Sequence, residues 1–294
     1  MVDPYAAGGP ADVIARVLAA GMSDTLRQKV VVENIGGAGG VTGAEHVVHA
    51  QPNGYEFLFG TGGILSSVPS LYQHPPFNPE TDFAPVGLIV TAPSFLIARK
   101  DFPASNLKEF IAYAKAHPGA LQFGSGGAGS GPHIVCVSFN MTAGVTALHV
   151  PYRGAGPAYQ DLLPGRIDYM CDFIATALPH IKSGEVKGIA TLTRERSPLL
   201  PDLPTADEQG LTGFDAPGWY SLMLPKRMPD AIVRRLNAAM SDALDSPAVK
   251  DRLTQLGNVV VPRAQRTPEY LAKFLASEIG KWAGPIKASG VSMD

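Results

Sequence analysis

The sequence lacks any apolar run of 18 or more residues, so none of its 294 residues belong to a segment that predicts a membrane-spanning helix. It also lacks an excess of basic residues, because 24 Lys and Arg stand against 26 Asp and Glu. No basic stretch is interleaved with aromatic residues, which argues against nucleic acid as a partner. The 45% hydrophobic content is sufficient for a sizeable core, and the length suits two domains of ordinary size.

Cysteine is scarce: Cys136 and Cys171 are far apart and lie outside any Cys-x-x-Cys or Cys/His cluster. This spacing argues against a zinc site and against a redox dithiol. We interpret both residues as buried thiols. A disulfide between them is the alternative if the chain is exported and the fold brings their Cα atoms together.

Signatures of common enzyme sites are missing as well. The sequence contains no G-x-x-x-x-G-K-[ST], no H-E-x-x-H and no G-x-S-x-G. His133 stands at the start of an expected helix without an acidic partner nearby in sequence, and we interpret it as a hydrogen-bonded structural residue rather than a base. The sequence therefore predicts no catalytic residues and no metal site.

What the sequence does contain is an alternation of short β-branched or aromatic runs with amphipathic runs. This pattern is typical of an α/β protein with largely parallel sheets. Apolar stripes predict helices over residues 106–117 and 229–244 and from Pro268 onward. The expected strands are 30–32, 55–59, 86–97, 122–123, 148–150, 167–171 and 188–192.

No Pro/Ser-rich linker separates the two expected domains. Domains without such a linker are best joined by two or more strand crossings that act as a hinge. We expect these crossings near residues 99–103 and 219–224.

Three glycine-rich turns precede expected helices: "PYAAGGPADVIAR" (4–16), "LFGTGGILSS" (58–67) and "LQFGSGGAGSGPHIV" (121–135). Small residues leave room there, and the free N–H groups of a helix start favour an anion. The hydroxyls of Thr61, Ser125 and Ser130 can donate further hydrogen bonds. Because strand-to-helix loops of an open α/β sheet gather at one rim, these turns predict an anion site, with plain tight turns as the alternative.

The third turn also raises an enzymatic alternative. Gly124, Gly126 and Gly129 satisfy G-x-G-x-x-G, but no acidic residue for the ribose of NAD occurs between Ser130 and Gln160. Arg153 suits a 2′-phosphate instead. An NADP-dependent oxidoreductase is therefore the alternative function.

Asp172 ends the expected strand "IDYMCD" on the same rim. Three roles are open for this carboxylate: it orients a ligand, it hydrogen-bonds a neighbouring loop, or it caps the following turn.

Six segments in order carry a resemblance to a known family: "YAAGGPADVIAR", "VVVENIGGAGGVTGAEHV", "PNGYEFLFGT", "AYAKAHPGALQFGSGGAGSGPH", "HVPYRGAGPAYQDLLPGRIDYMCD" and "PDLPTADEQGLTGFDAPGWY". With these segments, the chain resembles the TctC-like, or Bug, extracytoplasmic solute receptors of tripartite tricarboxylate transporters. The resemblance implies an α/β, bilobal periplasmic-binding-protein fold of type II-like architecture. Residues 1–99 and 222–294 would form one lobe and residues 100–221 the other, with a ligand cleft between them.

The resemblance also implies a function without catalysis. A small di- or tricarboxylate, or an aromatic carboxylate of the terephthalate kind, is captured between the lobes and delivered to membrane permease subunits. No cofactor is implied, and we expect a periplasmic monomer whose signal peptide is absent from this sequence. Which carboxylate is bound and which permease is the partner stay open.

The ligand residues implied by the resemblance follow the family's loops. They are Tyr5, Ala7, Gly8 and Pro10 in the first turn, Thr61 and Gly62 in the second, Ser125, Gly126 and Ser130 in the third, and Asp172, Phe173 and Ala175 on the far side. We expect one carboxylate on the first two turns and the rest of the solute facing Ser125, Asp172 and Phe173. At Gly127–Ala128 the sequence departs from the family, because an amide side chain is missing there.

Overall fold

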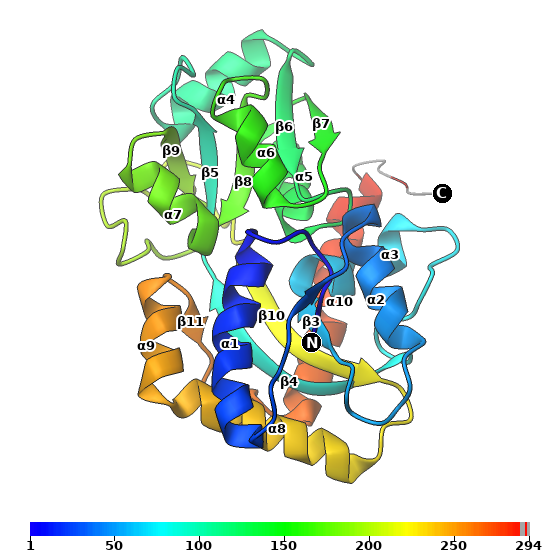
Figure 1. Cartoon of the computed structure of the whole chain (residues 1–294). Helices are drawn as coiled ribbons and strands as arrows, with labels where there is room; N and C mark the ends of the chain where they lie inside the picture. Colours follow the sequence, from blue (N-terminus) through cyan, green and yellow to red (C-terminus); the bar gives the residue numbers. More distant parts are fainter. Residues whose placement is uncertain (289–291, 293–294) are drawn as a thin grey trace.

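The computed structural model describes residues 1–288 and residue 292. Figure 1 shows two lobes, each built on its own sheet with helices packed around it, and the chain passing twice between them. No helix in the described residues has the length and apolarity needed to cross a membrane. The expected bilobal α/β fold with two crossings is confirmed.

The first lobe is built on a sheet of strand order β11-β4-β10-β3-β1-β2. Parallel pairing joins β1, β2 and β3, whereas β10 runs antiparallel to both β3 and β4. The strands are β1 (Val2–Asp3), β2 (Glu33–Asn34), β3 (Leu58–Thr61), β4 (Phe83–Ala92), β10 (Gly218–Pro225) and β11 (Val259–Val260). The helices are α1 (Pro10–Leu26), η1 (Ala38–Gly40), α2 (Val41–Val48), α3 (Gly62–Leu71), α8 (Asp230–Asp245), α9 (Pro247–Gln255), η2 (Arg263–Gln265) and α10 (Pro268–Ala288).

The second lobe is built on a sheet of order β7-β6-β8-β5-β9. Here β6 pairs in parallel with β7 and β8, while β5 is antiparallel to β8 and β9. Both sheets are thus mixed rather than largely parallel, because β5 and β10, which follow the crossings, and the edge strand β11 run antiparallel to their neighbours. The elements are β5 (Ser94–Arg99), α4 (Leu107–Ala116), β6 (Leu121–Ser125), α5 (Gly131–Ala143), β7 (Ala147–Pro151), α6 (Ala155–Leu162), β8 (Tyr169–Phe173), α7 (Ile174–Lys182) and β9 (Val186–Thr191).

The crossings lie elsewhere than expected. The apolar run 86–97 is not one strand: β4 ends at Ala92 in the first sheet, and β5 begins at Ser94 in the second. The expected second crossing, 219–224, falls inside β10. The crossings are therefore at Pro93 and in the connection 192–217, which ends at Pro217. Because the strands on both sides of Pro93 are buried, apolar periodicity does not show the change of sheet.

The expected strand at 30–32 also differs from the structure. These residues form an irregular connection, and only Glu33–Asn34 pairs with β1. Val31 is 60% exposed, whereas Val30 and Val32 are partly buried against the core, so these valines pack without pairing as a strand.

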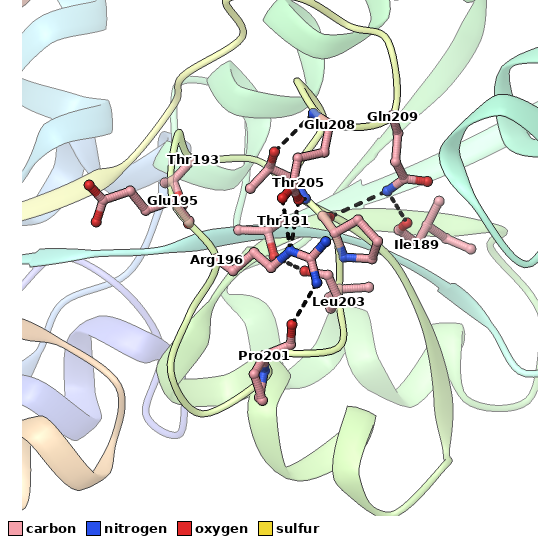
Figure 2. A network of polar contacts seen from close by, with 11 residues as sticks. Ile189, Thr191, Thr193, Glu195, Arg196, Pro201, Leu203, Thr205, Glu208 and Gln209 are labelled. Atoms are coloured by element: carbon pink, nitrogen blue, oxygen red, sulfur yellow. Dashed lines mark hydrogen bonds and ion pairs between the residues drawn. The ribbon is translucent and has the colours of Figure 1, made fainter.

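The second connection between the lobes is held firmly to the second sheet, as Figure 2 shows. Thr205 and Glu208 form a reciprocal capping pair, in which each backbone N–H donates to the other's side chain. Arg196 Nε donates to both carboxylate oxygens of Glu208, at 2.8 and 3.1 Å. The Thr205 strand bridge to Thr191 and the bond from Gln209 Nε2 to Ile189 O (3.0 Å) fix the connection against β9. These contacts fix the connection to the second lobe.

Where the crossings meet, they are tied to one another. The buried Ser94 hydroxyl donates to Ala216 O at 2.6 Å, and Ala216 N donates to Leu192 O at 2.9 Å. The two crossings have matching sequences, Ala92-Pro93-Ser94 and Ala216-Pro217-Gly218. The lobes thus share one narrow hinge.

The two cysteines form a disulfide between α5 and β8, with their Cα atoms 5.2 Å apart. The interpretation as buried thiols is wrong, and the alternative holds. The pair spans 35 residues of sequence, and only the packing of α5 on β8 brings it together. The spacing of the two cysteines in the sequence does not indicate that the fold brings them together.

Candidate functional site

A cleft of about 640 Å³, including its open mouth, lies between the lobes. Most of the cleft lining comes from strand ends and helix starts of both lobes, and Trp282 comes from the later part of α10. The first lobe contributes Tyr5, Gly9, Pro10, Ala11, Thr61, Gly62, Gly63, Ser66, Gly218, Trp219, Tyr220 and Trp282. The second lobe contributes Gly126, Ser130, Gly131, Pro132, Ile134, Val135, Gly154, Ala155 and Phe173, and Pro217 belongs to the crossing.

Among the described residues, five helices begin at this cleft: α1 and α3 from the first lobe, and α5, α6 and α7 from the second. Their N-cap residues are Gly9, Thr61, Ser130, Gly154 and Phe173, and within the described chain none of them caps its helix with a side-chain hydrogen bond. The first N–H groups of a helix have no partner inside it, and the helix dipole adds partial positive charge there. The cleft therefore offers uncapped backbone donors from both sides, which suit an anion.

Glycine lets these helix starts approach one another. A Cβ on Gly63, at the start of α3, would lie 2.1 Å from the amide nitrogen of Gly131 at the start of α5. A Cβ on Gly62 would lie 2.6 Å from the indole nitrogen of Trp219. Side chains at these positions would push the lobes apart or displace the tryptophan.

Hydroxyl groups supplement the backbone donors. Tyr5 Oη and Thr61 Oγ1 share a hydrogen bond of 3.1 Å. Ser130 Oγ and Tyr220 Oη are buried and have no partner in the part of the chain that the structure describes. Burial raises the pKa of Tyr5 and of Tyr220, so both phenols stay protonated and can donate.

The lobes touch around the cleft. Ala6 N donates to Arg153 O at 3.2 Å, and Ser67 Oγ donates to Gly129 O at 3.1 Å. The rings of Phe173 and Tyr220, one from each lobe, meet edge to face at 6.3 Å. These contacts describe a closed arrangement of the two lobes.

Of the ligand residues expected from sequence, seven line the cleft, namely Tyr5, Pro10, Thr61, Gly62, Gly126, Ser130 and Phe173. Ala7, Gly8, Ser125, Asp172 and Ala175 are outside its lining. The Gly8 N–H donates to Asp12 Oδ2 at 3.0 Å rather than into the cleft. Glycine is required at this position by its φ of +86°, not by a close approach, since no described atom lies within 4 Å of a Cβ placed there.

The side chain of Ser125 hydrogen-bonds within the glycine loop that follows it and does not line the cleft. Its Oγ accepts from Gly127 N (3.1 Å) and shares a 2.7 Å hydrogen bond with His149 Nε2. Gly129 N donates to His133 Nδ1 at 3.0 Å. His133 is therefore a hydrogen-bonded structural residue, as expected. Because the Gly127 and Gly129 N–H groups are already used, this loop does not offer the donors that a dinucleotide pyrophosphate needs.

The two histidines stack with their ring centroids 4.1 Å apart. Burial lowers the pKa of His133 to about 3, with the neighbouring His149 adding to the effect, and burial lowers the pKa of His149 to about 4. Both rings are therefore neutral hydrogen-bonding partners at physiological pH.

Acidification is expected to reduce stability through His149. Its pKa is about 4 in the folded chain and 6.5 when unfolded, so the unfolded state binds the proton first as the pH falls. The stability contributed by the neutral ring is complete above pH 6.5 and is lost as the pH falls through 4, about 1–2 kcal/mol by pH 5. His149→Gln keeps a hydrogen-bonding partner for Ser125 without titrating. The advantage of wild type over this variant in unfolding free energy should shrink between pH 7 and 5, and a constant difference would contradict the assignment.

Asp172 lies behind the cleft wall, fully buried between α6 and α7. Its Oδ2 accepts from Tyr159 Oη (2.9 Å) on α6 and from Thr176 Oγ1 (2.5 Å) on α7. Burial raises the pKa of this carboxyl group. The sequence left three roles open for Asp172: orienting a ligand, hydrogen-bonding a neighbouring segment, or capping the following turn. The structure shows hydrogen bonds to the neighbouring helices α6 and α7.

Sequence reasoning missed the two tryptophans of the cleft. The indole N–H groups of Trp219 (3.0 Å) and Trp282 (3.1 Å) both donate to Glu278 Oε2, which fixes the two rings. Trp282 belongs to the apolar stripe of the last helix, and periodicity cannot distinguish a core position from a cleft position. For Trp219, the sequence feature that could have indicated a cleft position is that it directly follows the pair Pro217-Gly218.

Two α/β lobes around a cleft of uncapped helix starts, joined by a double crossing, define a bilobal solute-binding protein. The sequence profile of the tripartite tricarboxylate transporter family receptor, TctC, matches residues 14–291. The chain belongs to this family, whose members are receptors and not enzymes.

Solved structures of the family are close to this one. The periplasmic binding protein BugD is 40% identical with a TM-score of 0.95, over 100% of this chain and 98% of its own. MatC from Rhodopseudomonas palustris, solved with bound malate, is 40% identical with a TM-score of 0.94, over 97% of both chains. Another R. palustris protein, solved with adipate, is 30% identical with a TM-score of 0.92, over 99% of this chain and 97% of its own.

Proposed function

We propose that this receptor captures a small carboxylate between its lobes and delivers it to the permease subunits of a tripartite tricarboxylate-type transporter. The observation that carries the proposal is the meeting of helix starts without side-chain caps, two from the first lobe and three from the second, in one cleft. The malate and adipate bound by its structural relatives are carboxylates of this kind.

The cleft residues expected from sequence would contact the solute directly. Ser125 and Asp172 would act from behind, Ser125 by holding the glycine loop and Asp172 by holding α6 and the first turn of α7. A solute that bonds to both lobes favours the closed arrangement over the open one by its differential affinity. The permease would then recognise the closed form.

The Cys136–Cys171 disulfide supports a periplasmic location, because such bonds persist in oxidising compartments. A monomer that exchanges between the transporter and free solution is the form we propose.

Thermal unfolding with added solutes tests the function. A solute at 100 times its dissociation constant should add about 2.7 kcal/mol to the unfolding free energy. We expect stabilisation by carboxylates and quenching of the cleft tryptophans, Trp219 and Trp282, with NADP and inorganic phosphate as controls. Stabilisation by NADP alone, with every carboxylate silent, would overturn the proposal.

A further inference from the structure

One buried carboxylate holds both tryptophans of the cleft wall. Glu278, on α10, is 8% exposed, and its Oε2 accepts from Trp219 Nε1 at 3.0 Å and from Trp282 Nε1 at 3.1 Å. Trp219 lies at the start of β10, two residues after the crossing at Pro217. Trp282 lies one turn beyond Glu278 on α10. A single side chain therefore joins the strand that leaves the hinge to the last helix.

The burial of this carboxylate is explained by the two indoles. The cation paired with it, the Lys281 ammonium, lies 3.7 Å from Glu278 Oε1 and is 40% exposed, so water screens this ion pair. Burying an acid without hydrogen-bond donors is unfavourable, and the two indole N–H groups supply such donors. An apolar side chain in place of Glu278 would leave both N–H groups without their acceptor, which is costly in a buried position.

The orientation of the two rings shapes the cleft. Both tryptophans line it, and Trp219 packs so closely on the start of α3 that a Cβ on Gly62 would lie 2.6 Å from the indole nitrogen. Each indole has one donor, and Glu278 uses both donors. The rings therefore contribute apolar surface to the cleft, and a rotation of either ring would move its wall.

Beyond the cleft, the same face of α10 reaches the second lobe. Glu278, Trp282 and Ile286 are spaced four residues apart, which places them on one side of the helix, and they are 8%, 6% and 1% exposed. Helix α10 contacts α3 and β4 of its own lobe and also α5 of the second lobe (Figure 1). Trp282 and Ile286 belong to an apolar cluster that includes Val135 and Phe139 of α5. The face that Glu278 fixes is thus part of the contact between the closed lobes.

We propose that Glu278 is a positioning residue of this receptor: it sets the orientation of both cleft tryptophans and, through Trp282, holds the end of α10 against the second lobe. Glu278 is not part of the cleft lining, so it acts on solute affinity through the rings. Both of its indole donors are neutral, so the property required at Oε2 is an acceptor oxygen rather than a negative charge. The effect on affinity rests on the proposed function.

The indole signals of the free protein test the positioning directly. The sequence contains two tryptophans, so the nitrogen-15 spectrum of the indoles has one signal for each partner of Glu278. Glu278→Met keeps the length of the side chain and removes the acceptor, whereas Glu278→Gln keeps a carbonyl oxygen. We expect both indole protons to exchange with water at least about 10-fold faster in Glu278→Met and to stay slow in Glu278→Gln. A response of one signal alone, or of neither, would overturn the inference.

Titration calorimetry with malate and adipate tests the effect on affinity. Glu278→Met should weaken binding by about 10-fold, and Glu278→Gln should stay within about 3-fold of wild type. The matched control is Asn237→Leu on α8, which removes two hydrogen bonds, to Val86 O and Arg266 O, from a residue outside the cleft lining. This control should lower the melting temperature and leave the affinity and both indole signals unchanged.

The outcomes separate the inference from the proposed function. Wild-type affinity in Glu278→Met, or an equal loss in Glu278→Gln, would overturn the inference. If Glu278→Met does not fold, Glu278→Asp replaces it, because a side chain shorter by one methylene cannot reach both rings at once and should weaken binding as well. Failure of wild type to bind malate, adipate or any carboxylate of the thermal screen would overturn the proposed function, and the two indole signals would still decide whether Glu278 positions the rings.

Discussion

Gly63→Ala is expected to lower the affinity for the solute by about 100-fold or more while each lobe keeps its fold. The new Cβ would stand 2.1 Å from Gly131 N and 2.6 Å from Gly131 Cα, which are backbone atoms of the facing lobe and cannot rotate away. Within its own lobe, alanine is well suited to the first turn of α3. The lobes must therefore stay apart, and the closed, binding-competent state becomes rare.

A matched substitution separates closure from a general effect of an added methyl group. Gly280→Ala places a Cβ on the exposed side of α10, where no described atom lies within 4 Å, so affinity should be unchanged. Calorimetry measures the affinity of both variants, and small-angle scattering with saturating solute reports whether the lobes close. Wild-type affinity in Gly63→Ala would contradict the closed arrangement as the binding state.

Removing the disulfide is expected to give the largest loss of stability. Replacing Cys136 and Cys171 together by alanine opens a loop of 35 residues in the unfolded chain, which should cost about 3–4 kcal/mol of unfolding free energy. Alanine is preferable to serine here, because both sites are fully buried and a serine hydroxyl would need a partner.

Chemical denaturation measures this cost. Affinity should fall as well, because the bond joins α5, which begins with Gly131 in the cleft, to β8, which ends at Phe173. Wild type denatured in the presence of a reductant serves as the control and should match the double variant. Equal unfolding free energies for oxidised wild type and double variant would contradict a stabilising role.

The fold was predictable to the extent that local pattern determines it. Apolar stripes predicted α4 and α8 to within a few residues of their observed bounds, and strand–turn–helix sequences predicted the three glycine turns. Six ordered sequence segments identified the family. The change of sheet at Pro93 was not predictable, because the apolar strands on both sides of it are buried alike. The sheet to which a strand belongs depends on partners far away in sequence.

The lining of the cleft was predictable where a residue stands at a helix start. Thr61, Gly62 and Ser130 stand at helix starts, and a helix start can be recognised from sequence. Ser125 and Asp172 stand on the same rim, but their orientation depends on His149 and Tyr159, which reach them from other elements. Sequence shows which residues share an edge of the sheet, not which of them face the cleft.

The hinge described above limits how the protein can move. Proline fixes its own φ near −65°, so Pro93 and Pro217 remove a torsional freedom from each crossing. The Ser94–Ala216 bond holds the two crossings side by side, and the braced connection follows the second sheet as one piece. Two linked crossings with restricted backbone torsions favour rotation of the lobes about the hinge over sliding of one lobe along the other. For a partner that contacts both lobes, the separation of the two lobe surfaces would then indicate whether a solute is bound.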